Sequence, residues 1–229
     1  MKATAAAKRR RSSGGERELA VFDVCDTLFH ENTTIGFLRF VHGNSAAYAR
    51  REWLAVSRLS PAFYAAALSQ RLFDWDVARL WLVRSLRGTS RKMLRTAAKD
   101  YADHLMSEKR NSPLLDRLEE HRRRSDRIVL VSSSLDIVVA AIAEHLSVEY
   151  RASTLGFDDD RCTGRIDRDL TGNKEAAVEA LGQRGLLHVY TDNRSDLGMI
   201  RIADRATIVV PRGRSSRWAE GQDYDLIRL

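Results

Sequence analysis

The chain has 229 residues, of which 44% are hydrophobic, and a formal net charge of +7. This length suffices for one ordinary hydrophobic core with an inserted subdomain. We find no run of eighteen apolar residues, and no apolar segment follows the basic N-terminus, so we expect neither a membrane span nor a signal peptide. The two cysteines, Cys25 and Cys162, are too few for a disulfide framework, and we expect a cytoplasmic protein.

The first eighteen residues are predicted to form a disordered basic tail. They contain six Lys or Arg against two Glu, which is +4 of the net +7. They are also rich in Ala, Ser and Gly and lack apolar periodicity. An arm for nucleic acid or an anionic membrane is one interpretation, and a solvated tail is the favoured one. We therefore expect no stable nucleic-acid partner.

Four short apolar runs are typical of buried parallel strands. They cover residues 19–24, 127–134, 186–192 and 206–211. Helical patterns lie between or beside them, at residues 136–146, 174–185 and 195–204. Strands that alternate with helices predict a doubly wound, Rossmann-like α/β fold with a parallel sheet. Ligands of such a sheet bind beyond the carboxyl ends of its strands.

Consecutive helical patterns interrupt this alternation after the first strand. One of them begins with Ser60 as its N-cap and Pro61 at the first helical position. We therefore predict an all-helical cap over residues 33–110, inserted into an α/β core formed by residues 19–32 and 111–229.

Polar side chains that suit phosphate chemistry follow three of the predicted strands or begin a predicted helix. These candidates are Asp23, Thr27, Ser132, Lys174, Asp192 and Asp196. Carboxylates can hold a hard cation, a lysine offsets phosphate charge, and hydroxyl groups donate to phosphate oxygens. The set suits phosphoryl transfer to a carboxylate.

The same residues fall in four stretches that resemble the motifs of the haloacid-dehalogenase (HAD) superfamily, in the family's order. "FDVCDTL" is similar to the first motif, "VLVSSS" to the second, "TGNKEAAV" to the third and "YTDNRSDLGMI" to the fourth. The segment "LGFDDDRCTGRI" and the helical insertion are similar to subfamily IB, the phosphoserine-phosphatase-like branch. The resemblance covers residues 19–229. It implies a Mg²⁺-dependent phosphatase, either a phosphomonoester hydrolase or a phosphotransferase, whose partner is a small-molecule phosphate ester.

The resemblance also implies a role for each motif residue. Asp23 would be the nucleophile that forms an aspartyl-phosphate. Mg²⁺ would be held by Asp23, the backbone carbonyl of Cys25 and Asp192, with support from Asp196. The residues that would bind the phosphoryl group are Thr27, Ser132, Ser133 and Lys174.

The first motif departs from the family pattern at Cys25, where HAD phosphatases usually have an aspartate that serves as general acid and base. A thiol with a pKa near 8.5 is a poor substitute for a carboxyl group. Three explanations remain open. In the first, Asp26 takes over as the catalytic acid and base. In the second, the leaving group needs little protonation, or it takes its proton from water, the substrate or the nearby His30 or Glu31. In the third, turnover is slow or absent. In the last case the protein would bind phosphate or act as a scaffold.

The sequence narrows the substrate only in part. Phosphoserine phosphatases carry a glutamate shortly after the first motif that reads the substrate amino group, and nine residues after Asp23 this chain has Asn32, so phosphoserine is not favoured. The large aromatic side chains of the cap are best explained as its core. The alternative is an apolar groove for an amphipathic, lipid-linked phosphate, or peripheral contact with a membrane. Haloacid dehalogenation is a lesser candidate, because dehalogenases do not need the cation that Asp192 and Asp196 would hold.

Overall fold

The structure is a computed structural model of the full chain, and a defined part of it can be described. The described residues are 17–43, 45–57, 64, 77–182, 185–215, 217–219 and 224–229. Most of the predicted basic tail, residues 1–16, and the helix predicted to begin at Ser60 therefore lie outside the described residues.

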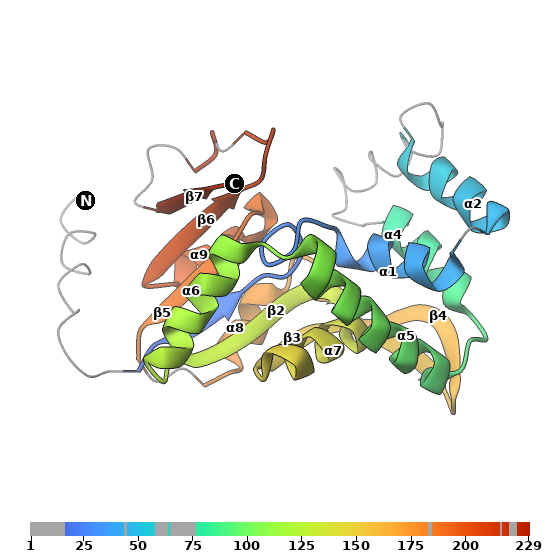
Figure 1. Ribbon diagram of the computed structural model, residues 1–229, viewed down its shortest axis with the longest axis horizontal. Coiled ribbons are helices and arrows are strands. Elements are labelled where there is room, and N and C mark those ends of the chain that lie inside the picture. The colour runs from blue at the N-terminus through green and yellow to red at the C-terminus, as the bar shows by residue number, and fades with distance from the viewer. Residues whose placement is uncertain are drawn as a thin grey trace.

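Seven strands form one sheet in the order β4-β3-β2-β1-β5-β6-β7 (Figure 1). The strands are β1 (Leu19–Phe22), β2 (Arg127–Leu135), β3 (Glu149–Asp158), β4 (Arg161–Arg168), β5 (Leu187–Thr191), β6 (Arg205–Val210) and β7 (Asp225–Arg228). Neighbouring strands pair in parallel, except for the antiparallel β3 and β4. The predicted α/β fold with a mostly parallel sheet is confirmed.

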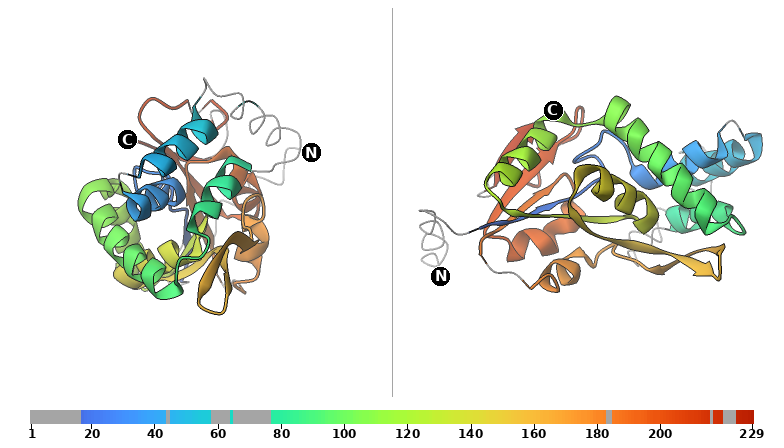
Figure 2. Two further views of the ribbon diagram at one scale, coloured as in Figure 1. Left: turned by 90° about the vertical axis from the view of Figure 1, so that its right-hand side faces the viewer. Right: turned by 60° about the horizontal axis from the view of Figure 1, so that its bottom comes forward.

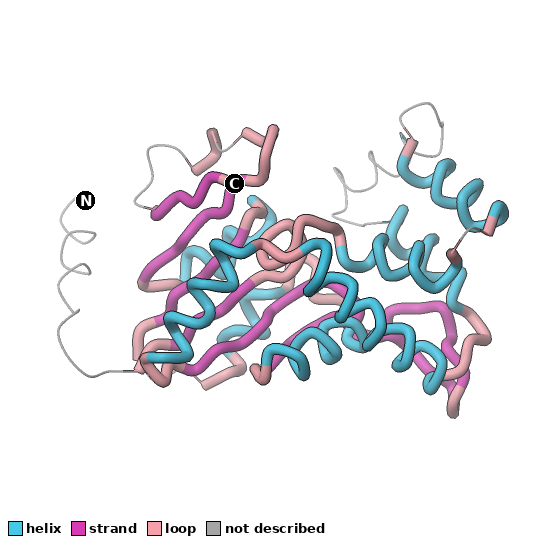
Figure 3. Tube along the Cα trace, in the orientation of Figure 1, coloured by secondary structure: helices cyan, strands magenta, loops and turns pink. Residues whose placement is uncertain are grey.

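The helices flank this sheet and fill the insertion after β1 (Figure 3). Those between β1 and β2 are α1 (Thr33–His42), α2 (Ala46–Val56), α4 (Val77–Val83), the 3₁₀ turn η2 (Arg84–Leu86), α5 (Arg91–His104), the π-helical turn η3 (Leu105–Lys109) and α6 (Ser112–Arg123). Those after β2 are α7 (Asp136–Leu146), α8 (Lys174–Glu179), the 3₁₀ turn η4 (Arg194–Asp196) and α9 (Leu197–Ile202). The predicted helical insertion between the first two strands is thus present.

Both faces of the sheet are covered, which explains why its central strand is apolar throughout. Side chains of a strand alternate between faces. Ala20 and Phe22 belong to the core beneath α5, α6 and α7, whereas Leu19 and Val21 belong to the core beneath α8 and α9. The two helical layers are visible on opposite sides of the sheet (Figure 2). A strand buried on both faces reads as a continuous apolar run, as residues 19–24 do.

The strand register brings the predicted site residues to one edge. Phe22 of β1 stands opposite Leu130 of β2 and Tyr190 of β5 in parallel ladders. The residues that follow these positions therefore leave the sheet at the same edge, its carboxyl edge. They include Asp23, Ser132 and Asp192.

Several helices of the insertion pack against the core, and α1 contacts both α7 and β2. Helix α5 packs along α7 and α1, and helix α4 and the turn η2 contact β4. Among the predicted cap aromatics, Phe37 is buried, Trp81 packs against the main core, and Phe40 and Tyr64 are exposed. Those between residues 58 and 76, Tyr64 apart, lie outside the described residues, as does the side chain of Trp53.

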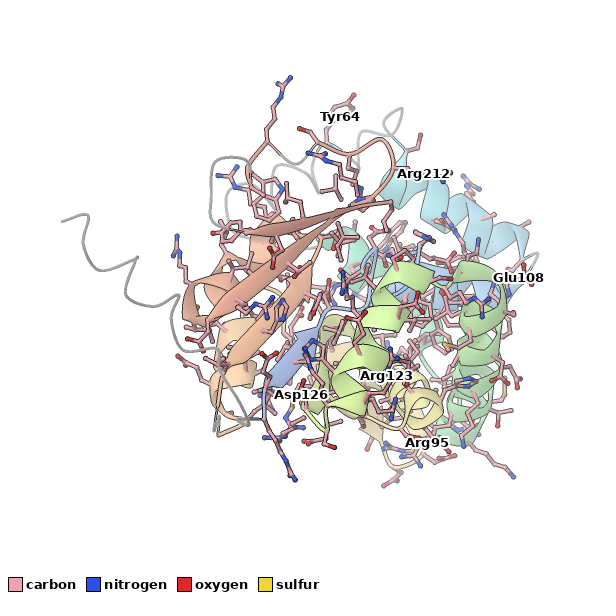
Figure 4. All side chains as sticks on the ribbon, turned by 60° about the vertical axis from the view of Figure 1, so that its left-hand side comes forward. Tyr64, Arg95, Glu108, Arg123, Asp126 and Arg212 are labelled. Carbon is pink, nitrogen blue, oxygen red and sulfur yellow. The ribbon has the colours of Figure 1, made fainter. Side chains whose placement is uncertain are left out.

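The helix surfaces carry the charged residues that periodicity places outward. Arg95 on α5 and Arg123 on α6 are exposed, as is Glu108 of η3 (Figure 4). None of the described helices is both long and apolar enough to span a membrane.

Candidate active site

A buried lysine joins two carboxylates at the carboxyl edge of the sheet. Asp23 follows β1 directly, and its main-chain N–H donates to the carbonyl of Tyr190 at 2.9 Å. Lys174, the first residue of α8, donates through Nζ to Asp23 Oδ1 at 2.8 Å and to Asp196 Oδ2 at 2.9 Å. Thr191 Oγ1 donates to the same oxygen of Asp196 at 2.6 Å. Asp23, Lys174 and Asp196 are all at least nine-tenths buried, so the cluster is held away from bulk water.

A second pair of carboxylates lies next to this cluster. The main-chain N–H of Asp192 donates to Thr27 Oγ1 at 3.1 Å, which ties the loop after β5 to the loop after β1. Arg214, from the loop after β6, donates through Nη1 to Asp192 Oδ2 at 3.2 Å and through Nη2 to Asp26 Oδ2 at 2.8 Å. Asp26 adopts a left-handed φ of 52°. Its side chain faces Arg214, whereas that of Asp23 faces Lys174 and that of Cys25 faces Thr33 and Ser134.

Burial and neighbouring charges shift the pKa values of Asp23, Asp192 and Lys174. Burial raises the pKa of Asp23 to about 6, although the charge of Lys174 opposes the rise. Burial also raises the pKa of Asp192 to about 7, and the charges of Asp23 and Asp26 add to that rise. For Lys174, burial would lower the pKa, but the charges of Asp23 and Asp196 outweigh it and raise the pKa. Lys174 is therefore a fixed cation, and the carboxylates are short of positive charge.

This shortage fits a hard cation. Asp192 is almost fully buried, yet the cationic side chain that holds it, Arg214, is largely exposed to solvent. Carboxylate and carbonyl oxygens are the ligands that Mg²⁺ prefers. Asp23, the carbonyl of Cys25 and Asp192 would supply them, whereas Asp196 is engaged by Lys174 and Thr191 and would act through those bonds.

Cys25, which stands where a carboxylate was expected, belongs to a ring of hydroxyl groups. Its Sγ lies 3.1 Å from Thr33 Oγ1 and 3.1 Å from Ser134 Oγ, and those two hydroxyls lie 2.5 Å apart. The main-chain N–H of Thr33 also donates to the sulfur at 3.4 Å. Burial, with a smaller contribution from Asp23, raises the pKa of the thiol. Cys25 is therefore a protonated, weak hydrogen-bond donor near neutral pH.

The two predicted phosphate ligands on β2 have different surroundings. Ser132 is fully buried, and its Oγ accepts from the main-chain N–H of Ser134 at 3.2 Å. That bond leaves the hydroxyl hydrogen of Ser132 free to donate. Ser133 is partly exposed.

Arg79 of α4 crosses from the insertion to the core. It donates through Nη1 to the carbonyl of Ser133 at 2.6 Å and through Nη2 to Thr171 Oγ1 at 2.9 Å, and it forms an ion pair with Asp169. Arg79 is itself buried. It thereby joins the second motif, the loop before α8 and the insertion.

The residues considered for reading a substrate amino group have structural partners. The side chain of Asn32 accepts from the main-chain N–H of Ile35 and caps α1. Glu31 Oε2 accepts from the buried Tyr101 hydroxyl at 2.8 Å. Gly36 is close to both, since a Cβ there would lie 2.1 Å from the Tyr101 oxygen. The carboxylate at this place in the structure is therefore that of Glu31, and it already accepts a hydrogen bond from Tyr101.

Sequence reasoning missed Arg214, Arg79, Thr33 and Ser134. The first two pair with acids 188 and 90 residues away in the chain, and no local pattern marks such a contact. The hydroxyl residues stand beside recognised motifs, in "HENTT" and "VSSS", so their position did offer a signal.

Comparison with protein families gives one strong match. The model described as haloacid dehalogenase-like hydrolase matches residues 20–201, which is most of the chain. A search of curated protein sequences found no significant match.

Solved structures share this fold at low sequence identity. A protein of unknown function from Bordetella pertussis Tohama I has a TM-score of 0.73 at 19% identity, covering 93% of this chain and 99% of that one. The phosphoserine phosphatase from T. onnurineus has a TM-score of 0.57 at 20% identity, covering 93% and 90%. A phosphoserine phosphatase described as a phospho-aspartyl intermediate analogue has a TM-score of 0.58 at 17% identity, covering 85% and 87%. At these identities the likeness concerns the fold.

Proposed function

Because the chain belongs to the haloacid dehalogenase-like hydrolase family, we propose that it is a Mg²⁺-dependent phosphatase that works through an aspartyl-phosphate on Asp23. The observation that carries the proposal is the buried contact of Lys174 Nζ with Asp23 and Asp196 at the carboxyl edge of the sheet. In an α/β fold that edge is where ligands bind. Phosphoryl transfer to a carboxylate needs a positioned nucleophile and compensation of phosphate charge, and this cluster supplies both.

The chain's own residues can perform the first step. Lys174 occupies Asp23 Oδ1 and leaves Oδ2 of the same carboxylate available for attack on phosphorus. Ser132 and Thr27 would donate to the phosphoryl oxygens, and Lys174 would neutralise part of their charge. Mg²⁺ on Asp23, the Cys25 carbonyl and Asp192 would offset the remaining negative charge. As the bond from Asp23 to phosphorus forms, the bond from phosphorus to the ester oxygen breaks, and that oxygen leaves with the electron pair and becomes an alcohol when it gains a proton.

Protonation of that alcohol is the step for which the site is least equipped. Asp26 is ion-paired to Arg214, and a carboxylate in the charged form has no proton to donate. Cys25 can donate a proton only weakly. The site therefore suits leaving groups that need little protonation. The second candidate is a protein that turns over slowly or not at all and acts by binding phosphate or as a scaffold. The hydroxyl ring around Cys25 is the observation that favours it. Dehalogenation is less well supported, because the buried Asp192 calls for a cation.

The substrate class we propose is a small or amphipathic phosphorylated metabolite. Structures of phosphoserine phosphatase, one of them a substrate-bound complex, share the fold. Asn32 caps a helix here, so phosphoserine itself has no particular support.

The test is hydrolysis of p-nitrophenyl phosphate with Mg²⁺ and with excess chelator. We expect Asp23→Asn to lower kcat by about a thousandfold or more, since the nucleophile is removed. Asp116→Asn, the same change at an exposed position of α6, should leave kcat unchanged. Activity retained in folded Asp23→Asn would exclude the mechanism.

A further inference from the structure

A cavity of about 650 Å³ adjoins the candidate active site, because Arg214, which contacts Asp192, also lines the cavity. Its walls include Asp26 and His30 from the loop after β1, and Arg212 and Arg214 from the loop after β6. Pro113 at the start of α6 also lines it. A volume of this size is typical of small-molecule sites. The motif residues that bind phosphate in our proposal do not line it, so it is a separate compartment.

Two arginines reach this cavity from one tight turn. The main-chain N–H of Arg214 donates to the carbonyl of Pro211 at 3.1 Å, which closes a four-residue turn. Gly213 has a φ of +74°, a left-handed value that a residue with a Cβ adopts only with strain. The turn follows β6 directly. It therefore presents Arg212, labelled in Figure 4, and Arg214 at the same edge of the sheet as Asp23.

Among the described residues, one of the two arginines that line this cavity is paired with carboxylates and the other is not. Arg214 is shared between Asp26 and Asp192. Arg212 is exposed and forms no ion pair or hydrogen bond with any described residue, and the same holds for the side chain of His30. Asp26 is the one side-chain carboxylate among the described residues of the lining. An anionic group that entered the cavity would meet Arg212 without displacing a partner.

We propose that this cavity is an anion subsite, in which Arg212 holds a carboxylate or phosphate group with help from Arg214. A guanidinium group presents two parallel donors that match either anion. Pro113 and Pro211 offer apolar surface to a short carbon skeleton. The anion belongs either to the leaving group of the substrate, in which case the inference rests on the proposed function, or to a separate small acid.

The direct test is to measure the binding of D-glycerate to the Asp23→Asn variant of the full chain. Binding is monitored by a ligand-observed NMR titration. Glycerate carries no phosphate, so it does not compete for phosphoryl transfer, and glycerol is its uncharged counterpart. We expect glycerate to bind and glycerol not to bind. Arg212→Met should weaken glycerate binding about tenfold or more, because a charge-assisted hydrogen bond is lost. Arg212→Lys should restore part of it. Arg217→Met, at an exposed arginine outside the cavity lining, should bind like the parent.

A kinetic comparison identifies the source of the anion. A higher kcat/KM for 3-phosphoglycerate than for glycerol 3-phosphate, with the ratio lost in Arg212→Met, assigns the subsite to the leaving group. Equal values, with glycerate binding retained, assign it to a separate acid. Glycerate binding by a chain that hydrolyses neither ester would leave the subsite standing while the proposed function fails. Absence of glycerate binding, or equal binding by Arg212→Met and Arg217→Met, would overturn the inference.

Discussion

In the proposed mechanism, the Cys25 thiol stands where a general acid would protonate the leaving alcohol. It is held by Thr33 and Ser134, two hydroxyls that can neither ionise at neutral pH nor act as strong acids. A carboxyl group in this position could act as a general acid, which contributes typically 10²–10⁴-fold to a rate. We therefore expect the side chain at position 25 to decide which leaving groups the site can release.

We predict that Cys25→Asp increases kcat for glycerol 3-phosphate by about a hundredfold, with a smaller gain for p-nitrophenyl phosphate, whose leaving group needs no proton. Cys25→Ser keeps a hydroxyl in the ring without adding a carboxyl group, and it should show no gain. Steady-state kinetics with the two substrates measures both effects. If folded Cys25→Asp shows the same rate ratio as wild type, protonation is not the missing function.

His188 lies in a buried chain of hydrogen bonds away from the catalytic edge. Its Nε2 lies 2.8 Å from Thr207 Oγ1, its Nδ1 lies 3.3 Å from the Tyr190 hydroxyl, and that hydroxyl lies 2.9 Å from His121 Nε2. Burial lowers the pKa of His188 from 6.5 to about 3, and the charge of Arg205 adds to the shift. The imidazole is therefore neutral in the folded protein.

This neutrality predicts a loss of stability in acid. Below pH 6.5 the unfolded chain binds a proton at His188 that the folded chain does not bind, so stability falls as pH drops toward 3. Between pH 7 and pH 5 the loss from this residue is about 2 kcal/mol. Because other groups titrate in the same range, urea unfolding should be compared with His188→Gln at both pH values. Parallel pH profiles for the two proteins would contradict the assignment.

At the scale of elements, Arg79 joins α4 to the core. It connects the insertion to the carbonyl of Ser133 and to the loop that carries Asp169 and Thr171, just before Lys174. The position of α4 is thus coupled to two segments of the candidate site. A displacement of α4 would therefore shift the donor that the Ser133 carbonyl accepts from.

We predict that Arg79→Met destabilises the protein by about 1–3 kcal/mol, since it leaves Asp169 and the Ser133 carbonyl without their donor. Asp169→Asn should destabilise the Arg79→Met variant less than it destabilises wild type, because the side chains of Arg79 and Asp169 interact. A double-mutant cycle from denaturant unfolding measures this coupling. Additive effects would show that the contact contributes nothing to stability.

Local sequence patterns predicted the elements that have regular periodicity. The helix expected at residues 136–146 is α7 with the same bounds. The helix expected at 174–185 ends at Glu179, and the left-handed Gly182 lies just beyond it. Strand β7, Asp225–Arg228, was not predicted, because four residues with charges at both ends give no apolar run.

At the scale of the whole molecule, the fold class and the family could be predicted because motif order and element alternation are properties of the linear chain. The ion pairs that shape the site could not be predicted from the sequence. Arg214 meets Asp26 and Asp192 only after β6 has taken its place beside β5, and that contact depends on the complete sheet. The proposed anion subsite could likewise not be predicted from the sequence, because its arginines and His30 come from loops about 180 residues apart.

In the proposed mechanism, Asp23 carries a phosphoryl group during turnover. The measurement that tests it most directly is mass spectrometry of the acid-quenched protein after mixing with p-nitrophenyl phosphate and Mg²⁺, with peptide mapping of the modified site. We predict one phosphoryl group on the peptide that contains Asp23, and less of it at steady state in Cys25→Asp, where a carboxylate can activate water for hydrolysis of the intermediate. Turnover without phosphorylation of that peptide, or with the phosphoryl group on another residue, would contradict the account.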